Sequence, residues 1–425
     1  MKNWKYRDLV QNISIVLLSL TAVFLFTRTQ LYTLGMDAGD SYFQYLTGGS
    51  DQTSTAGETA LTGLTAPVRT AVTGVYGGRF GSVTLTTTDE SFEPVGGLLR
   101  EALRSAQDFS PCESREFLKA LEGTSVYCDF LEPLPLSVLA GLVGAAVDSG
   151  LTARQVLIVP DGTEGTLLYL WDGGADCRRA VSAVSPEELD SVVGSYELNG
   201  ASFAMDSPEP DAAGIAPCSL FPPSIPALPV FTSSTVLPDS SALLAALGFY
   251  PRTNSRYTES GGVEVITDGD RTLRISPDGS IRYRSGGDPA LTIAAAGETP
   301  TVTEAVMGAS TLLNALLPAQ TGGAGLYLRG VRQGETTATL SFGWQIGGVP
   351  IRFTGGGSAG EVTLTGTAVT ALSLCFRQYT DTGEMSLLLP LRQALAIAAG
   401  QRRGAELSIG YVDDGVTARA GWLSD

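Results

Sequence analysis

The chain has 425 residues, of which 43% are hydrophobic, and it carries a formal net charge of −17. Such an acidic chain repels phosphate backbones, so nucleic-acid binding is disfavoured. Histidine is absent, which excludes serine–histidine–aspartate and cysteine–histidine catalysis, histidine-ligated zinc and imidazole acid–base chemistry.

The first predicted element is a membrane anchor. Residues 13–26 are apolar apart from hydroxyl side chains, and with their flanks they extend over 9–34, long enough for a bilayer-spanning helix. The segment 1–8 carries three positive charges and one negative charge, which predicts a cytoplasmic N-terminus and an extracytoplasmic remainder. A cleaved signal peptide begins in the same way, but residues 27–30 offer no small-x-small cleavage site, so an uncleaved anchor is favoured.

One face of this anchor is the predicted partner-binding site. Ser14, Thr21 and Arg28 recur at seven-residue spacing and therefore lie on the same side of a helix. Small and hydroxyl-bearing side chains allow helices to approach closely in lipid and can hydrogen-bond across the interface. An alternative stays open, in which the hydroxyl groups bond to their own helix backbone.

The next segment, 35–66, is rich in threonine, glycine and serine and offers little to bury, so we expect a spacer. Residues 67–220 then mix helices and strands without regular alternation, which predicts an α+β domain. Its predicted strands are 68–75, 81–87, 125–130, 155–159, 166–171 and 178–183. Its predicted helices are 92–106, 114–121, 136–147 and one that begins at Pro186 with Ser185 as its N-cap.

Five prolines interrupt residues 221–238, so this stretch is predicted to be a linker and not a continuous strand or helix. Two further units follow, a helix with a three-stranded meander at 239–292 and a C-terminal α+β domain at 293–425. The predicted helices are 240–247, 303–317 and 388–399. The predicted strands are 263–267, 271–275, 281–284, 325–332, 337–345, 349–353, 361–377, 406–412 and 416–422.

The predicted fold class is therefore α+β, with a single N-terminal transmembrane helix followed by mixed α/β and antiparallel-sheet extracytoplasmic domains. Five cysteines without a CxxC pair favour buried free thiols over a disulfide framework. Cys112 and Cys128 are the pair nearest in sequence, should an outward-facing chain join two of them.

Several acidic groups could suggest a site. Asp268 and Asp270, followed by Asp278, lack the closing glutamate of a calcium loop, and hairpin turns favour these same residues. The adjacent carboxylates at 187–188 and 413–414 could serve a glycosidase, but chance pairs are abundant among 44 acids. We therefore predict no catalytic, cofactor-binding or metal-ligating residue.

Two stretches carry a family resemblance: 246–260, ALGFYPRTNSRYTES, and 269–279, GDRTLRISPDG. They resemble the YycH/YycI family of membrane-anchored regulators, and the closing segment 407–422 is similar to the family's last strands. The resemblance implies a bitopic protein of Gram-positive bacteria that binds the sensor histidine kinase of a cell-envelope two-component system. It also implies a non-enzymatic protein that acts alongside a related YycH/YycI paralogue.

The expected location is therefore the cell membrane, crossed once, with the N-terminus in the cytoplasm and the C-terminus outside. Two other functions stay open on the sequence alone. One is a cell-wall or ligand-binding module with a pocket between the two halves, and the other is a carboxylate hydrolase that acts on envelope polymers.

Overall fold

The computed structural model describes residues 67–424 except 77–78, 86–91, 142–149, 163–164, 198–199, 238, 251, 287–290 and 318–320. The predicted anchor 9–34 and spacer 35–66 lie outside the described residues. No helix within the described part is long and apolar enough to cross a membrane. The described residues belong to one compact unit, Leu61–Asp425.

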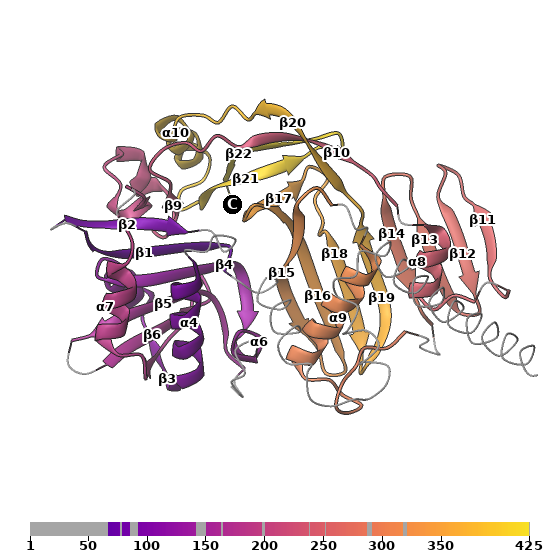
Figure 1. Cartoon of the computed structure of the whole chain (residues 1–425), viewed down its shortest axis with the longest axis horizontal. Coiled ribbons are helices and arrows are strands. Elements are labelled where there is room, and N and C mark those ends of the chain that lie inside the picture. Colours follow the sequence, from indigo (N-terminus) through magenta and orange to yellow (C-terminus); the bar gives the residue numbers. More distant parts are fainter. Residues whose placement is uncertain are drawn as a thin grey trace, which may run out of the picture. The chain divides into compact units, whose positions relative to one another are not determined.

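An antiparallel seven-stranded sheet occupies the N-terminal half of this unit, with strand order β2-β1-β4-β5-β6-β7-β3 (Figure 1). Its strands are β1 (Arg69–Tyr76), β2 (Arg79–Leu85), β3 (Gln107–Cys112), β4 (Ser125–Pro135), β5 (Thr152–Asp161), β6 (Gly165–Trp171) and β7 (Cys177–Ser182). Its helices are α4 (Glu93–Ser105), α5 (Ser114–Leu121), α6 (Leu136–Gly141) and α7 (Pro186–Gly194).

Helices cover both faces of this sheet, because successive side chains of β4 pack into two different clusters. Val126 and Cys128 pack into a cluster with α4, α6 and α7, whereas Tyr127 between them packs into a second cluster with α5. Successive side chains of a strand point to opposite faces, so the helices cover opposite sides of the sheet. The predicted start of α7 is confirmed, because the Ser185 side chain accepts a hydrogen bond from the Glu188 N–H at 3.1 Å.

A thirteen-stranded sheet occupies the C-terminal half and branches at β16. Its strands are β10 (Pro229–Ser234), β11 (Ser255–Thr258), β12 (Glu264–Asp268), β13 (Arg271–Ile275), β14 (Ser280–Arg284), β15 (Ala324–Gln333), β16 (Thr337–Ile346), β17 (Val349–Phe353), β18 (Gly360–Thr365), β19 (Ala368–Cys375), β20 (Gln378–Met385), β21 (Leu407–Asp413) and β22 (Thr417–Ser424). Its helices are α8 (Ser240–Ala246), α9 (Val302–Leu316) and α10 (Leu391–Gln401). The short elements β8 (Ser202–Phe203), η2 (Ala204–Asp206), η3 (Pro210–Gly214) and β9 (Leu220–Phe221) connect the two halves along the chain.

Strand β16 pairs with β15 along one edge, and with both β17 and β18 along the other. The β18 branch continues through β19, β14, β13 and β12 to β11, and the β17 branch through β21, β22 and β10 to β20. Strands β17 and β21 run parallel, while the other described pairs of this sheet are antiparallel. The expectation of a mixed fold of helices and mostly antiparallel sheets is confirmed.

The structure differs from the predicted domain organisation in two places. The expected linker 221–238 contains β10, which pairs with both β20 and β22. Three of its prolines precede the strand, and Pro229 is its first residue, where a missing N–H is tolerated. The expected boundary at 292/293 separates strands of one sheet, because β14 pairs with β19 over five residue pairs.

The predicted single strand 361–377 is wrong. The chain turns back between β18 and β19, which pair with each other. Gly366 occupies this turn with a φ of +57°, a conformation that glycine adopts without steric cost. The predicted helix at 388–399 begins later, at Leu391, and residues 386–390 before it form neither helix nor strand.

Candidate functional site

Strand β20 forms one edge of the thirteen-stranded sheet. Its residues from Thr380 onward are exposed, and its only described strand partner is β10. Thr382, Gly383 and Glu384 face Val230 alone, because the register shifts between the Phe231–Asp381 and Pro229–Met385 pairs. Such a bulge twists an edge strand and limits uncontrolled pairing with other chains.

The chain leaves β20 with three apolar side chains pointing into solvent. Met385, Leu387 and Leu389 are 55%, 99% and 45% exposed, and we call these three residues the apolar stripe. The side chain of Ser386, between the first two, is buried, and its Oγ accepts a hydrogen bond from the Ala420 N–H at 2.9 Å. Successive side chains of a strand-like chain point to opposite sides, so burial of Ser386 leaves Met385 and Leu387 facing solvent.

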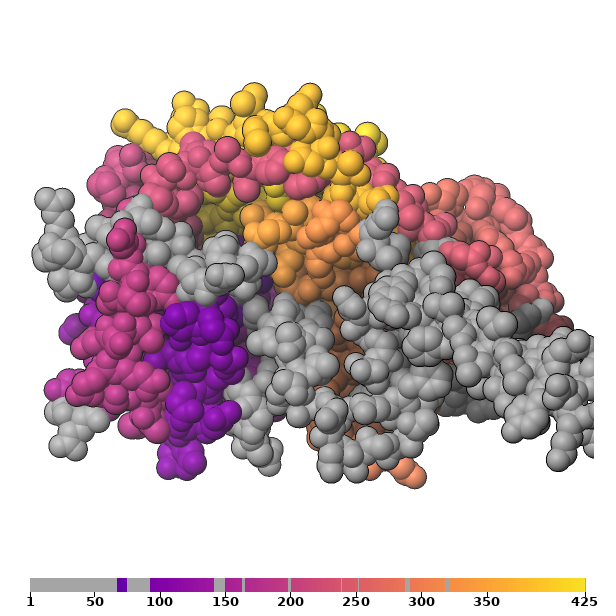
Figure 2. Space-filling view, in the orientation of Figure 1, coloured from indigo at the N-terminus to yellow at the C-terminus, as the bar shows by residue number. Residues whose placement is uncertain are grey.

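The backbone of the apolar stripe is held at both ends. The N–H of Ser386 donates to the carbonyl of Leu228 at 2.8 Å, and the indole N–H of Trp422 donates to the carbonyl of Leu389 at 2.8 Å. In the space-filling view, the yellow C-terminal segments lie at the surface (Figure 2). The stripe is thus a positioned, solvent-facing row of apolar side chains.

Behind β20, a buried carboxylate joins three strands. Asp413 at the end of β21 accepts hydrogen bonds from Ser233 Oγ of β10 at 2.8 Å and from Tyr379 Oη of β20 at 2.9 Å. The N–H of Gly415 also donates to it, at 2.7 Å. The Arg377 Nε lies 3.5 Å from the carboxylate, a charge contact without hydrogen-bond geometry.

This environment keeps Tyr379 protonated, because burial and the nearby Asp413 carboxylate both raise the pKa of its hydroxyl. The hydroxyl therefore remains a hydrogen-bond donor to Asp413. The network fixes the start of β20, and with it the direction in which the apolar stripe leaves the sheet.

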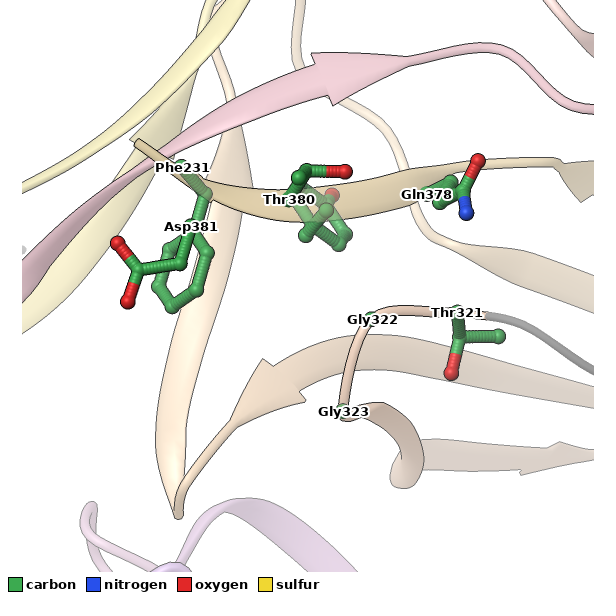
Figure 3. A pocket seen from close by; sticks show the side chains of 8 residues that line it. Phe231, Thr321, Gly322, Gly323, Gln378, Thr380 and Asp381 are labelled. Atoms are coloured by element: carbon green, nitrogen blue, oxygen red, sulfur yellow. The ribbon is translucent and has the colours of Figure 1, made fainter. Parts of the chain in front are cut away.

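An open depression of about 480 Å³ lies beside the same strand. Figure 3 shows the loop 321–323 running beside β20, with Gln378, Thr380 and Asp381 on the strand. The N–H of Tyr379 donates to the Thr321 carbonyl across it at 3.2 Å. Its lining comes from the C-terminal sheet and its own loop, so it is not the pocket between the two halves that the ligand-binding alternative requires.

A second polar cluster joins the two sheets. Asp129 on β4 is 1% exposed and lies opposite Arg69 of β1 in the strand register. Its carboxylate accepts from Arg69 at 3.3 Å and from Arg154 of β5 at 3.2 Å. Both guanidinium groups also bind Glu406, immediately before β21 of the other sheet. Two positive and two negative charges therefore balance one another in a site largely shielded from water.

The electrostatics of this cluster favour its charged form. Burial alone would raise the pKa of Glu406, but the Arg69 and Arg154 guanidinium groups outweigh it and lower that pKa below its ordinary value. The Leu131 backbone adopts a positive φ of 68° beside the cluster, and its N–H donates to Asp129 at 2.8 Å. We interpret the cluster as an electrostatic clamp between the sheets.

The predicted partner-binding residues Ser14, Thr21 and Arg28 lie outside the described residues. The interpretation of 268–270 and 278 as turns agrees with the hairpins that the structure has there. Asp268 accepts from Tyr250 N–H, Thr253 Oγ1 and Arg271 at 3.0, 2.7 and 2.8 Å.

Asp413 and Asp414 lie in different surroundings. Asp413 is buried in the network behind β20, whereas Asp414 accepts from the N–H groups of Val416 and Thr417 in the exposed turn at 2.8 and 2.7 Å. Within residues 67–424, apart from the gaps named above, no group of three or more potential ligands is arranged to hold a metal ion.

Sequence reasoning missed the apolar stripe. Residues 387–389 are three consecutive leucines, and the predicted helix 388–399 includes the last two of them. The signal that could have identified it is Pro390, because the residue before a proline is biased away from helical geometry.

Comparisons of the chain with protein-family models, with curated proteins and with solved structures found no match.

Proposed function

We propose that this protein is a non-enzymatic, membrane-anchored extracytoplasmic regulator that binds a sensor histidine kinase of a cell-envelope two-component system. A related YycH/YycI paralogue is the second proposed partner. The proposal takes its partner class from the resemblance of 246–260 and 269–279 to the YycH/YycI family. The structural observation that supports it is the apolar stripe.

The apolar stripe supports a protein contact because of its exposure and its fixed geometry. Burying a leucine side chain contributes about 1.5–3 kcal/mol, and Leu387 is 99% exposed with Met385 and Leu389 beside it. Grouped apolar side chains at a surface commonly mark interaction sites. Because hydrogen bonds already order this backbone, the stripe itself loses little conformational entropy when a partner binds.

The anchor contributes the second part of the proposed contact. In the membrane, the face formed by Ser14, Thr21 and Arg28 meets a kinase transmembrane helix, while the apolar stripe meets the kinase outer domain. Confinement of both proteins to one membrane raises their effective concentration, so a modest outer contact is sufficient. The clamp at Asp129 and Glu406 keeps the two sheets of the outer part together as the contact forms.

Co-purification of the full-length chain with a co-expressed sensor histidine kinase from the same organism tests this proposal. The double variant Leu387→Asp, Leu389→Asp places charge on the stripe. We expect it to reduce recovery of the kinase by roughly tenfold or more, because a loss of about 1.4 kcal/mol of binding free energy lowers the affinity tenfold. The control is Val181→Asp on β7, which is 61% exposed on the other sheet. Equal recovery with all three proteins would contradict a role for the stripe.

A further inference from the structure

Two cysteines that are 65 positions apart in the sequence meet at one edge of the seven-stranded sheet. Cys112 is the last residue of β3 and Cys177 the first residue of β7, and the two are direct partners in the antiparallel register. Their Sγ atoms lie 2.7 Å apart. All five cysteines of the chain are free thiols in this structure.

This separation is shorter than ordinary non-bonded contact. Carbon atoms meet at about 3.5–4.0 Å, and sulfur is larger than carbon. Directly opposed residues in antiparallel strands have Cα atoms about 4.5 or 5.5 Å apart, and disulfides span Cα separations of about 4.4–6.8 Å. The strand pairing therefore already supplies the backbone geometry that a disulfide needs.

The surroundings fit a structural bond and not a reactive thiol. Cys177 is 2% exposed and packs in the cluster that contains Phe117 and Tyr169. Cys112 is half-buried at the rim of that cluster, which leaves one sulfur accessible to an oxidant. Burial raises the pKa of both thiols, and protonated thiols are poor nucleophiles once the pair is packed.

The location also explains why a covalent link is useful. Strand β3 is the edge of the sheet, and its register shifts between Gln107 and Ser110. Asp108 has a positive φ of 56° in this bulge, and Pro111 cannot donate a ladder hydrogen bond. The edge strand therefore has a weakened ladder, which a bond between its last residue and β7 reinforces.

We propose that Cys112 and Cys177 are joined by a disulfide in the mature protein. The thiolate of Cys112 attacks the disulfide of a thiol oxidoreductase or of a small-molecule disulfide, forms a mixed disulfide and releases one thiol. The thiolate of Cys177 then attacks Cys112 Sγ and displaces the second thiol. Two S–H bonds are lost from this chain, one S–S bond forms, and the external disulfide accepts the two electrons and the two protons.

This inference rests on the extracytoplasmic location in the proposed function, because disulfides persist in oxidising compartments. It does not depend on kinase binding. Its test is therefore made on the chain alone, together with a check of its location by protease accessibility in intact cells. Free thiols in a chain that proves extracytoplasmic would overturn the disulfide and leave the location standing.

The experiment is peptide mapping of the full-length chain, solubilised from membranes, alkylated while denatured without reductant and then digested. We expect the peptides of Cys112 and Cys177 to appear as one linked species, about 2 Da lighter than the sum of the reduced peptides. Cys128, Cys218 and Cys375 serve as internal controls and should be alkylated. Alkylation of Cys112 and Cys177 as well, or linkage of either to another cysteine, would overturn the proposal.

A stability measurement provides an independent readout. Reductant should lower the Tm of the wild-type chain by roughly 5 °C or more, because the bond closes a long loop. It should not change the Tm of the double variant Cys112→Ser, Cys177→Ser, and Cys375→Ser should respond as the wild type does. Equal responses of wild type and double variant to reductant would contradict the disulfide.

Discussion

Arg69 and Glu406 are separated by 337 positions in the chain and form an ion pair between the two sheets. Arg69 begins β1, immediately after the predicted spacer, and Glu406 immediately precedes β21. Asp129 and Arg154 complete this clamp from β4 and β5. The first strand after the spacer is therefore connected directly to the sheet that carries the apolar stripe.

Replacement of Asp129 by asparagine should strongly destabilise the unit Leu61–Asp425. The substitution removes a carboxylate that is 1% exposed and leaves Arg69 and Arg154 with only Glu406 to balance them. Breaking a buried ion pair by removing one partner costs about 3–5 kcal/mol. Urea unfolding of residues 61–425 in the full-length chain, monitored by tryptophan fluorescence, measures this loss.

The matched control is Glu101→Gln on α4. Its ion pair with Arg104 spans 3.6 Å between side chains that are 42% and 58% exposed, and exposed pairs contribute about 0–1 kcal/mol. A loss for Asp129→Asn no larger than for this control would mean that the clamp does not stabilise the fold.

The clamp also predicts a direction for the effect of acid. The pKa of Glu406 is lowered from its ordinary value of 4.5, so its contribution to stability is present above that pH and is lost as the pH falls through the lower, folded-state pKa. Glu406→Gln should therefore show a weaker loss of stability between neutral pH and about pH 3.5 than the wild type. Urea midpoints across this range measure the difference, and parallel curves for the two proteins would contradict it.

Asp268, between the stretches 246–260 and 269–279, provides a third test. It accepts hydrogen bonds from Tyr250, Thr253 and Arg271, and the two bonds from Tyr250 and Thr253 lower its pKa. Asp268→Ala leaves the guanidinium of the buried Arg271 without its carboxylate partner, so we expect a lower urea midpoint than for the wild type. The exposed Glu188 on α7, replaced by alanine, should cost less than about 1 kcal/mol, and similar losses at both positions would contradict this role.

Local sequence patterns predicted most of the helices and strands, but they did not predict the clamp or the apolar stripe. Short apolar runs bounded by turn residues identified β5 and β6, and the Ser185–Pro186 start identified α7, because these signals lie within or next to the elements themselves. The division of 361–377 at Gly366 was missed because a lone glycine is also tolerated within a strand.

The clamp and the stripe depend on contacts between residues that are far apart in the sequence, and hydrophobic periodicity does not reveal such contacts. Arg69 and Glu406 meet only through the joining of two sheets, and nothing near either residue in the sequence identifies its partner. The exposure of Leu387 depends on the burial of Ser386 against Ala420, a contact between distant strands. Cys112 meets Cys177 and not the sequence-nearest Cys128 for the same reason, since β3 pairs with β7.

The anchor can be tested separately from the outer part. If Ser14, Thr21 and Arg28 form a packing face, Ser14→Leu with Thr21→Leu adds bulk at the point where a partner helix approaches, while membrane insertion is retained. Association with the kinase should weaken partially, since interhelical polar contacts in membranes average below about 2 kcal/mol. Val16→Leu with Val23→Leu, on the opposite side of a helix, is the control in the same co-purification, and equal effects of the two pairs would leave the helix as a plain anchor.

The most direct measurement is the autophosphorylation rate of the sensor kinase in membrane vesicles that contain the kinase alone, with the full-length chain, or with its Leu387→Asp, Leu389→Asp variant. We expect the wild-type chain to change the rate, and the stripe variant, inserted to the same level, to leave it near the value for the kinase alone. A rate that is the same with and without the wild-type chain would contradict the regulatory function proposed for this protein.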